Sequence, residues 1–182
     1  MKHFLLIFVA MALVGCGKKE TDQIVAAKLI VDPIVEKAIR EELKKPTGEL
    51  TVTDLNKVKE LDLENKELTD VPNGLDKLIN LKVLYLSRNK LTDVRDLEKL
   101  TQVKELILSV NRLTEVKSLE KLTQLEMLNL SNNKLTDVAG LGNLTNLWVL
   151  RLELIPDLTK AQIAELQKAL PKCKIWNSVT FR

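Results

Sequence analysis

The same order of apolar and polar positions occurs three times in succession between residues 81 and 138. Each copy has leucine or valine at its first position, leucine at its fourth, sixth and eleventh, and asparagine at its ninth. The copies start at Leu81, Val103 and Leu125, so each begins 22 residues after the one before. A unit this short cannot bury its apolar face alone and does so by stacking on its neighbours. The pattern therefore predicts an elongated stack of repeats.

Two less regular copies flank these three. The first starts at Val58 and has Lys66 at the asparagine position, with Asn65 one place early. The last starts at Leu147 and keeps the leucines of the strand, but Ile155 stands where the asparagine belongs. Irregular units are expected at both ends of such an array. We therefore expect about five repeats over residues 58–155.

The spacing of these leucines and asparagines resembles the signature of leucine-rich-repeat proteins. The resemblance implies an α/β fold, in which the repeats form a right-handed solenoid. A short parallel sheet would line its concave side, and turns or 3-10 segments would line its convex side. Because the terminal layers lack a neighbour on one side, each end of the solenoid needs a cap.

The N-terminal cap is expected over residues 30–57. Asp32 and Pro33 suit the N-cap and the first position of a helix, and Thr53 to Leu55 are interpreted as the approach to the first repeat. The helix would bury one apolar face. That face consists of Ile34, Val35, Ala38, Ile39 and Leu43. The block from residue 32 to residue 55 resembles the N-terminal cap of internalin-like bacterial leucine-rich-repeat proteins.

The C-terminal cap is expected over residues 156–182. Thr159 and Gln162 have the spacing of a capping box, which predicts the start of a helix. Its apolar face would consist of Ile163, Leu166 and Leu170. Ile175 and Trp176 are then interpreted as a further edge strand.

The N-terminus has the form of a targeting signal. Lys2 precedes an apolar stretch from Phe4 to Val14, which is too short to span a membrane and typical of a secretory signal. The sequence from Leu13 to Cys16 resembles the lipobox of bacterial lipoproteins. This resemblance implies a signal peptide over residues 1–15, a lipid on Cys16, and a tether over residues 16–29. An ordinary signal peptide with a coincidental cysteine is the alternative.

These features predict a protein that is lipid-anchored, through palmitate-type chains, in the bacterial cell envelope. Gly17 follows the expected lipidation site. By the enterobacterial sorting pattern, an aspartate there would favour the inner membrane, so Gly17 favours the outer membrane.

Composition bears on the class of function. The chain has a net charge of +3, and removal of residues 1–15 takes away Lys2 and lowers it to +2. This charge does not indicate nucleic-acid binding. His3 is the single histidine, so the mature chain would lack any histidine-based nucleophile system or metal site. No enzyme activity, cofactor or metal is expected, and Cys173 is interpreted as a buried structural thiol.

The repeated asparagines Asn89, Asn111 and Asn133 are expected to align in space. An asparagine side chain both donates and accepts hydrogen bonds. We expect the three to form a ladder that satisfies backbone groups where the chain leaves each strand. Thr-Asp and Thr-Glu pairs follow each asparagine position, and they suit turn capping better than calcium binding because the calcium-loop spacing is missing.

The residues between the strand leucines are expected to face the concave side. Several are apolar where they should meet water, which indicates a protein-binding surface with a polar rim. The predicted binding residues are Val83, Tyr85, Arg88, Ile107, Val110, Met127, Asn129 and Arg151. Strand propensity is the alternative reason for Val, Ile and Tyr at these positions. Trp148 could extend the patch, but sealing of the last layer is the favoured interpretation.

The sequence therefore predicts a membrane-anchored lipoprotein that binds another protein through the concave face of its solenoid. The partner's identity is not indicated. A structural, self-associating envelope protein is the main alternative. A carboxylate-based hydrolase that uses Asp62 with Glu60 or Glu64 is disfavoured, because a shallow sheet offers no water-excluding pocket.

Overall fold

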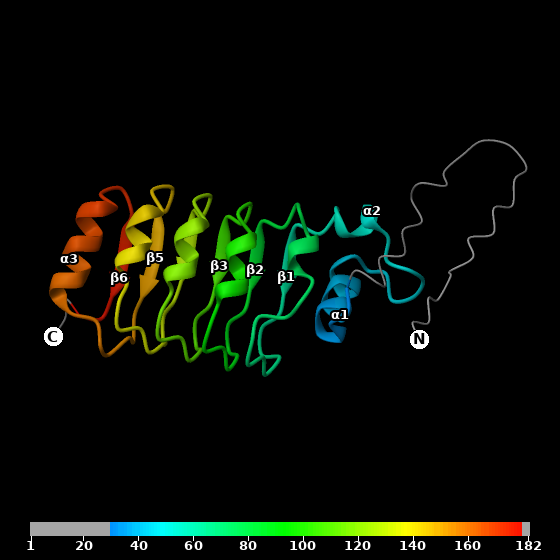
Figure 1. The fold of residues 1–182 in the computed structure, drawn as a ribbon, viewed down its shortest axis with the longest axis horizontal. Helices are drawn as coiled ribbons and strands as arrows, with labels where there is room; N and C mark the ends of the chain where they lie inside the picture. The colour runs from blue at the N-terminus through cyan, green and yellow to red at the C-terminus, as the bar shows by residue number, and fades with distance from the viewer. Residues whose placement is uncertain (1–29, 180–182) are drawn as a thin grey trace, which may run out of the picture.

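One parallel sheet runs along the whole stack of repeats (Figure 1). The computed structural model describes residues 30–179, and all structural statements below concern this part of the chain. The six strands of the sheet follow one another in sequence order. Their bounds are β1 Glu60–Asp62, β2 Val83–Tyr85, β3 Glu105–Ile107, β4 Met127–Asn129, β5 Val149–Leu152 and β6 Lys174–Asn177. The predicted leucine-rich-repeat solenoid is confirmed.

The register of the sheet pairs equivalent positions of neighbouring repeats. Leu61 lies opposite Leu84, Leu84 opposite Leu106, and Leu106 opposite Leu128. Residues at the same repeat position therefore form straight rows across the strands. Since side chains alternate between the two faces of a strand, one set of rows points into the core and the other points to the concave face.

The inward rows form a continuous leucine core. Leu84, Leu106, Leu128 and Leu150 are at most 1% exposed. Each such burial contributes about 1.5–3 kcal/mol, so the repeated leucines are the main stabilising contribution. The repeat period places the same side-chain shape at the same height in every layer, which lets successive layers interlock.

Short 3-10 helices occupy the opposite side of the solenoid, where the repeat signature predicts turns or 3-10 segments. They are η2 Leu75–Lys77, η3 Arg95–Lys99, η4 Lys117–Lys121 and η5 Ala139–Asn143. Each contributes one leucine to the core, such as Leu97, which is fully buried. The helices of successive repeats stack side by side along the molecule (Figure 1).

Two helices precede the first repeat. Helix α1, Pro33–Glu42, begins as predicted at Asp32, whose Oδ1 accepts from the backbone N–H of Ile34 at 2.9 Å. It packs beside β1 and buries Val35 and Ile39. Helix α2, Val52–Leu55, is a feature that the sequence interpretation missed. Its signal was the capping box between Thr51 and Asp54, in which each residue's side chain bonds the other's backbone N–H.

The C-terminal end combines a helix and a strand. Helix α3, Lys160–Ala169, starts at the capping box of Thr159 and Gln162 and packs against η5. Strand β6 then pairs in parallel with β5 and extends the sheet by one strand. Cys173, between the two, is 4% exposed. Among residues 30–179, no helix combines the length and apolar character needed to cross a membrane. The predicted signal peptide, tether and Cys16 lie outside the described residues.

Candidate binding face of the sheet

The concave face presents two parallel rows of strand side chains. The row of the third repeat position consists of Glu60, Val83, Glu105, Met127, Val149 and Lys174. The row of the fifth position consists of Asp62, Tyr85, Ile107, Asn129, Arg151 and Trp176. Both rows begin with an acidic residue on β1 and end with a basic or aromatic residue on β6. Between these ends, apolar residues alternate with Glu105 in one row and give way to Asn129 and Arg151 in the other.

The middle of the face is an apolar patch, which we define as Val83, Tyr85, Ile107, Met127 and Val149. Tyr85 lies directly opposite Ile107 in the register of β2 and β3, and Met127 lies opposite Val149. All five side chains are half-buried, so each keeps part of its surface open to solvent. A contiguous apolar area of this kind on a solvent-exposed surface is typical of a binding site.

Acidic side chains surround Tyr85. The pKa of its phenol is raised, first by burial and then by the negative charge of Glu60, with smaller effects from Glu105 and Asp62. The β1 side of the apolar patch is therefore electronegative.

Two of the predicted binding residues do not lie on strands. Arg88 and Val110 follow the ends of β2 and β3, in turns where the backbone is left-handed, with φ of 56° and 57°. The interpretation that placed them among the strand residues was therefore wrong. Arg88 Nε also forms an ion pair with Glu64 at 3.1 Å. Val110 remains 43% exposed at the edge of the face.

The two polar residues predicted on β4 and β5 are engaged within the chain. Asn129 Oδ1 accepts from the backbone N–H of Ser131 at 3.0 Å and so supports its own turn. Arg151 forms a 2.8 Å ion pair with Glu153, and this pair raises the pKa of the guanidinium. Both residues lie in the fifth-position row beyond Ile107 and border the apolar patch.

Two tryptophans are exposed at the β5–β6 end. The interpretation that Trp148 seals the last layer was wrong, because its side chain is 54% exposed. Trp176 is 45% exposed, and Lys174 Nζ lies 4.0 Å from its ring centroid, a cation–π contact. Sequence reasoning did not assign Trp176 and Lys174 to the face. The sequence feature that could have revealed them is the strand expected at Ile175 and Trp176, because this strand extends both concave rows.

The three repeated asparagines lie one behind another at the strand ends and are almost fully buried. Asn111 illustrates the arrangement. Its Nδ2 donates to the carbonyls of Leu86 at 2.9 Å and Leu108 at 3.0 Å, and its Oδ1 accepts from the backbone N–H of Leu91 at 3.0 Å. Asn89 and Asn133 make the corresponding bonds one repeat earlier and later. Each asparagine thus ties together the backbones of two repeats.

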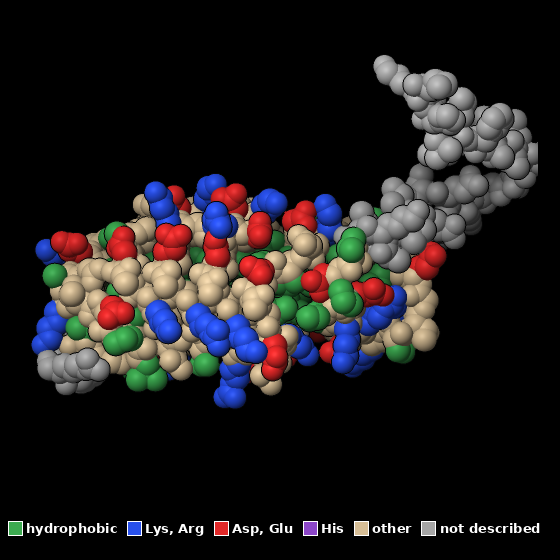
Figure 2. All heavy atoms as spheres, turned by 60° about the horizontal axis from the view of Figure 1, so that its bottom comes forward, with side chains coloured by type: hydrophobic (Ala, Val, Ile, Leu, Met, Phe, Trp, Pro, Cys, Tyr) green, Lys and Arg blue, Asp and Glu red, His purple; other side chains and the backbone are tan. Residues whose placement is uncertain are grey.

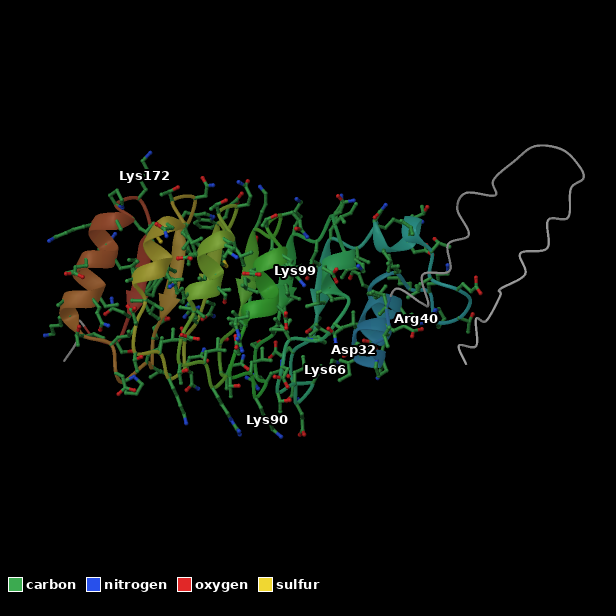
Figure 3. The ribbon with its side chains drawn as sticks, viewed as in Figure 1. Asp32, Arg40, Lys66, Lys90, Lys99 and Lys172 are labelled. Atoms are coloured by element: carbon green, nitrogen blue, oxygen red, sulfur yellow. The ribbon has the colours of Figure 1, made fainter. Side chains whose placement is uncertain are left out.

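The rest of the surface is strongly charged. Lys66 and Lys90 mark the edge at which the strands end (Figure 3). Figure 2 brings this edge forward and shows lysine, arginine, aspartate and glutamate side chains distributed along the solenoid. Cross-repeat ion pairs such as Lys121–Glu98, at 2.6 Å, connect neighbouring repeats. Mixed charge of this kind is typical of a solvated surface. The apolar patch differs in character from the charged surface around it.

Two of the acidic residues that follow the asparagine positions support turns. Asp93 and Asp137 each accept from a backbone N–H two residues ahead, at 2.8 and 2.9 Å. Within residues 30–179, no three histidine, cysteine or acidic residues are grouped so as to hold a metal ion.

The geometry of the candidate hydrolase residues does not resemble an active site. Glu60 and Asp62 are exposed side chains on an open strand, and Asp62 Oδ1 accepts from the backbone N–H of Glu64 at 2.8 Å. A hollow of about 320 Å³ at the C-terminal end is lined by side chains that carry no charge. Its lining residues are Leu154, Ile155, Pro156, Leu158, Ser178 and Val179.

Comparisons with known proteins agree with this architecture. Residues 56–113 match a family model described as leucine rich repeat, and residues 101–143 match a second model, described as leucine rich repeats in two copies. No curated protein matches the sequence significantly.

Solved structures show the same fold. An internalin, inlF, of Listeria monocytogenes is similar with a TM-score of 0.71 and 22% identity, over 89% of this chain and 48% of that one. A leucine-rich-repeat protein of Leptospira interrogans is 32% identical, with a TM-score of 0.61, over 68% of this chain and 32% of its own. The functional domain of InlJ from Listeria monocytogenes is 21% identical, with a TM-score of 0.61, over 84% and 38% of the two chains.

This chain therefore spans less than half the length of each of these relatives. Leucine-rich-repeat folds of this kind are typically non-enzymatic scaffolds for protein–protein interaction. The sheet register, the repeat models and the shared fold together show that the protein is a leucine-rich-repeat solenoid.

Proposed function

We propose that this protein is a lipid-anchored protein of the bacterial cell envelope that binds another protein through the concave face of its sheet. The apolar patch is the observation that carries the proposal. Tyr85 and Ile107 face each other across neighbouring strands, and Met127 and Val149 continue the apolar surface toward β5. Interfaces concentrate their binding free energy in such central aromatic and aliphatic groups, surrounded by a polar rim.

The patch differs from the apolar residues elsewhere on the surface. Ile79, for example, is 59% exposed but stands between η2 and β2, outside the rows of the sheet. Single exposed apolar residues of that kind are normal and need no partner. On the concave face, five apolar side chains lie on four adjoining strands, β2 to β5, and a partner could cover this arrangement.

Site-specific cross-linking would test this proposal in the bacterium that encodes the chain. A photoreactive phenylalanine analogue is placed at Tyr85, at Ile107, or at the matched exposed position Ile79 of the full chain. We expect the first two positions to cross-link to the same protein and Ile79 not to do so. If Ile79 gives the same adduct, or Tyr85 and Ile107 give none, the concave face is not the binding surface.

Anchoring is the second part of the proposal and has its own test. Metabolic labelling with an alkyne-bearing fatty acid should modify the wild-type chain and the Cys173→Ser variant, but not Cys16→Ser. Fractionation of the labelled membranes would then show whether the protein is in the outer membrane, as Gly17 favours. Equal labelling of Cys16→Ser and wild type would contradict lipidation at Cys16.

A further inference from the structure

Three carboxylates beside the apolar patch form no ion pair with any lysine or arginine of the described part of the chain. Glu60 and Asp62 on β1 are exposed, and Glu105 on β3 is half-buried. Three other glutamates near the sheet each form an ion pair within the chain.

The partners of these three glutamates are lysine or arginine residues. Glu64 pairs with Arg88 at 3.1 Å, Glu126 with Lys104 at 2.6 Å, and Glu153 with Arg151 at 2.8 Å. The acids without an ion pair therefore gather on one side of the concave face, around Tyr85. Burial raises the pKa of this phenol, and the charge of these acids raises it further. Within the two rows of the face, Lys174 lies on β6, at the opposite end from β1, over the Trp176 ring.

This placement restricts what can cover the apolar patch. A partner that buries Tyr85 and Ile107 also removes water from the carboxylates next to Tyr85. Loss of hydration around a charged group is costly unless an opposite charge replaces the water. An acidic partner surface would be disfavoured further, because like charges would meet. A neutral, purely apolar partner would also leave the three carboxylates without compensation.

We propose that the partner presents a lysine or arginine immediately beside an apolar side chain, and that this basic group lies over β1–β3. The apolar side chain packs on Tyr85, Ile107 and Met127, while the cation is held between Glu60, Asp62 and Glu105. The inference rests on the proposed function, since it names the chemistry that the same face selects. It also sets the orientation of the partner along the sheet.

Selection from a library of random peptides displayed on phage tests the proposed function and this inference separately. The bait is the full chain in detergent, immobilised through its C-terminus. One variant, Ile107→Glu, interrupts the apolar patch with a charged side chain. Two others change the acids: Glu60→Lys/Asp62→Lys reverses their charge, and Glu60→Gln/Asp62→Asn neutralises it with little change of shape. The control Asp96→Lys/Glu115→Lys makes the same charge change at exposed positions outside the sheet.

The proposal expects wild-type baits to enrich peptides with lysine or arginine next to aromatic or aliphatic residues. These peptides should bind Ile107→Glu and the charge-reversed variant at least about tenfold more weakly. Neutralisation should weaken binding less than reversal, and the control should bind like wild type. Wild-type affinity should fall as salt is raised, because screening weakens exposed charge interactions.

The contrary outcomes are distinct. Peptides that depend on Ile107 but show no basic preference would overturn this inference and leave the proposed function standing. Peptides that bind Ile107→Glu as well as wild type, or no enriched peptides at all, would contradict both. A concentration-dependent dimer of the wild-type chain, lost in Glu60→Lys/Asp62→Lys, would identify a second copy as the occupant and overturn the inference of a separate basic partner.

Discussion

The side-chain amide of Asn111 donates to the backbone carbonyl of Leu86, 2.9 Å away in the preceding repeat. This bond joins a residue of one layer to the backbone of another that is 25 positions earlier in the chain. Because both groups are buried, neither can exchange its partner for water. The repeated asparagines therefore connect the layers in addition to the leucine core.

Replacement of Asn111 by alanine should destabilise the solenoid by about 1–3 kcal/mol. The substitution leaves the N–H of Leu91 without its side-chain partner. It also removes one of the two asparagine donors to the carbonyl of Leu86 and one of the two to the carbonyl of Leu108. Chemical denaturation would measure the change. The control is Asn143→Ala, an exposed asparagine in η5, which should stay within about 0.5 kcal/mol of wild type. Equal stability of both variants would rule out this role for the asparagines.

Glutamate at position 107 should leave the fold intact, whereas glutamate at position 106 should unfold it. Ile107 faces the concave side and is half-buried, but Leu106 is in the core at 1% exposure. Burying an unpaired carboxylate at position 106 would cost several kcal/mol. Thermal unfolding followed by circular dichroism compares the two variants. Unfolding of Ile107→Glu would mean that the two faces of the sheet have been exchanged.

Asparagine should be more stable than valine at position 110. Val110 holds φ at 57°, a left-handed conformation that β-branched residues avoid and asparagine tolerates. Relief of this strain should raise the free energy of unfolding by about 1 kcal/mol, because the side chain is 43% exposed and loses little burial.

The reverse change provides the matching experiment. Asn132 occupies the equivalent position, with φ of 56°, so Asn132→Val should lower stability by a similar amount. Denaturant titrations of both variants give the two values. The changes in the free energy of unfolding of the two variants should have opposite signs. A loss of stability in Val110→Asn would show that Val110 makes contacts that outweigh its backbone strain.

Asp54 should make the N-terminal cap sensitive to acid. A hydrogen bond from Lys45 at 2.7 Å, and then one from the backbone N–H of Thr51, hold the pKa of Asp54 well below its usual value of 3.8. The folded state therefore binds this proton less readily than the unfolded state. The associated stability is present above the unfolded pKa and is lost as pH falls from there through the lower folded pKa.

Unfolding measured between neutral pH and strong acid would test this linkage. In Asp54→Asn, stability should fall less steeply below about pH 4 than in wild type, because the titrating group is gone. Lys45→Met should also flatten the profile by removing the largest cause of the pKa shift. Profiles that remain parallel to that of wild type would mean that Asp54 does not contribute to acid sensitivity.

The thiol of Cys173 should be unreactive in the folded protein. Its burial raises the pKa to about 11, so almost no thiolate is present near neutral pH. In the Cys16→Ser variant, Cys173 is the remaining cysteine of the sequence. A thiol reagent should therefore modify this variant only after denaturant is added. Rapid modification without denaturant would show that the segment between α3 and β6 opens readily.

The repeat pattern was sufficient to predict the interior of the molecule but not all of its surface. Leucine positions such as Leu84 and Leu106 recur at a period that permits only one stacking register, so their burial follows from the sequence. The concave positions of Val83, Tyr85 and Ile107 follow from the alternation of side chains along a strand. Arg88 and Val110 were misplaced, because the apolar pattern does not reveal where a strand ends and the backbone becomes left-handed.

The sequence by itself determined the solenoid, its leucine core and the rows of its sheet, because these depend on a regular local period that every layer repeats. The tertiary structure alone decided which different side chains meet. It brought Glu60 of β1 to Tyr85 of β2, and it placed Lys174 and Trp176 of β6 in the concave rows after the intervening helix α3. Such contacts join residues far apart in the chain, and they arise only when stacking sets the register between unlike repeats.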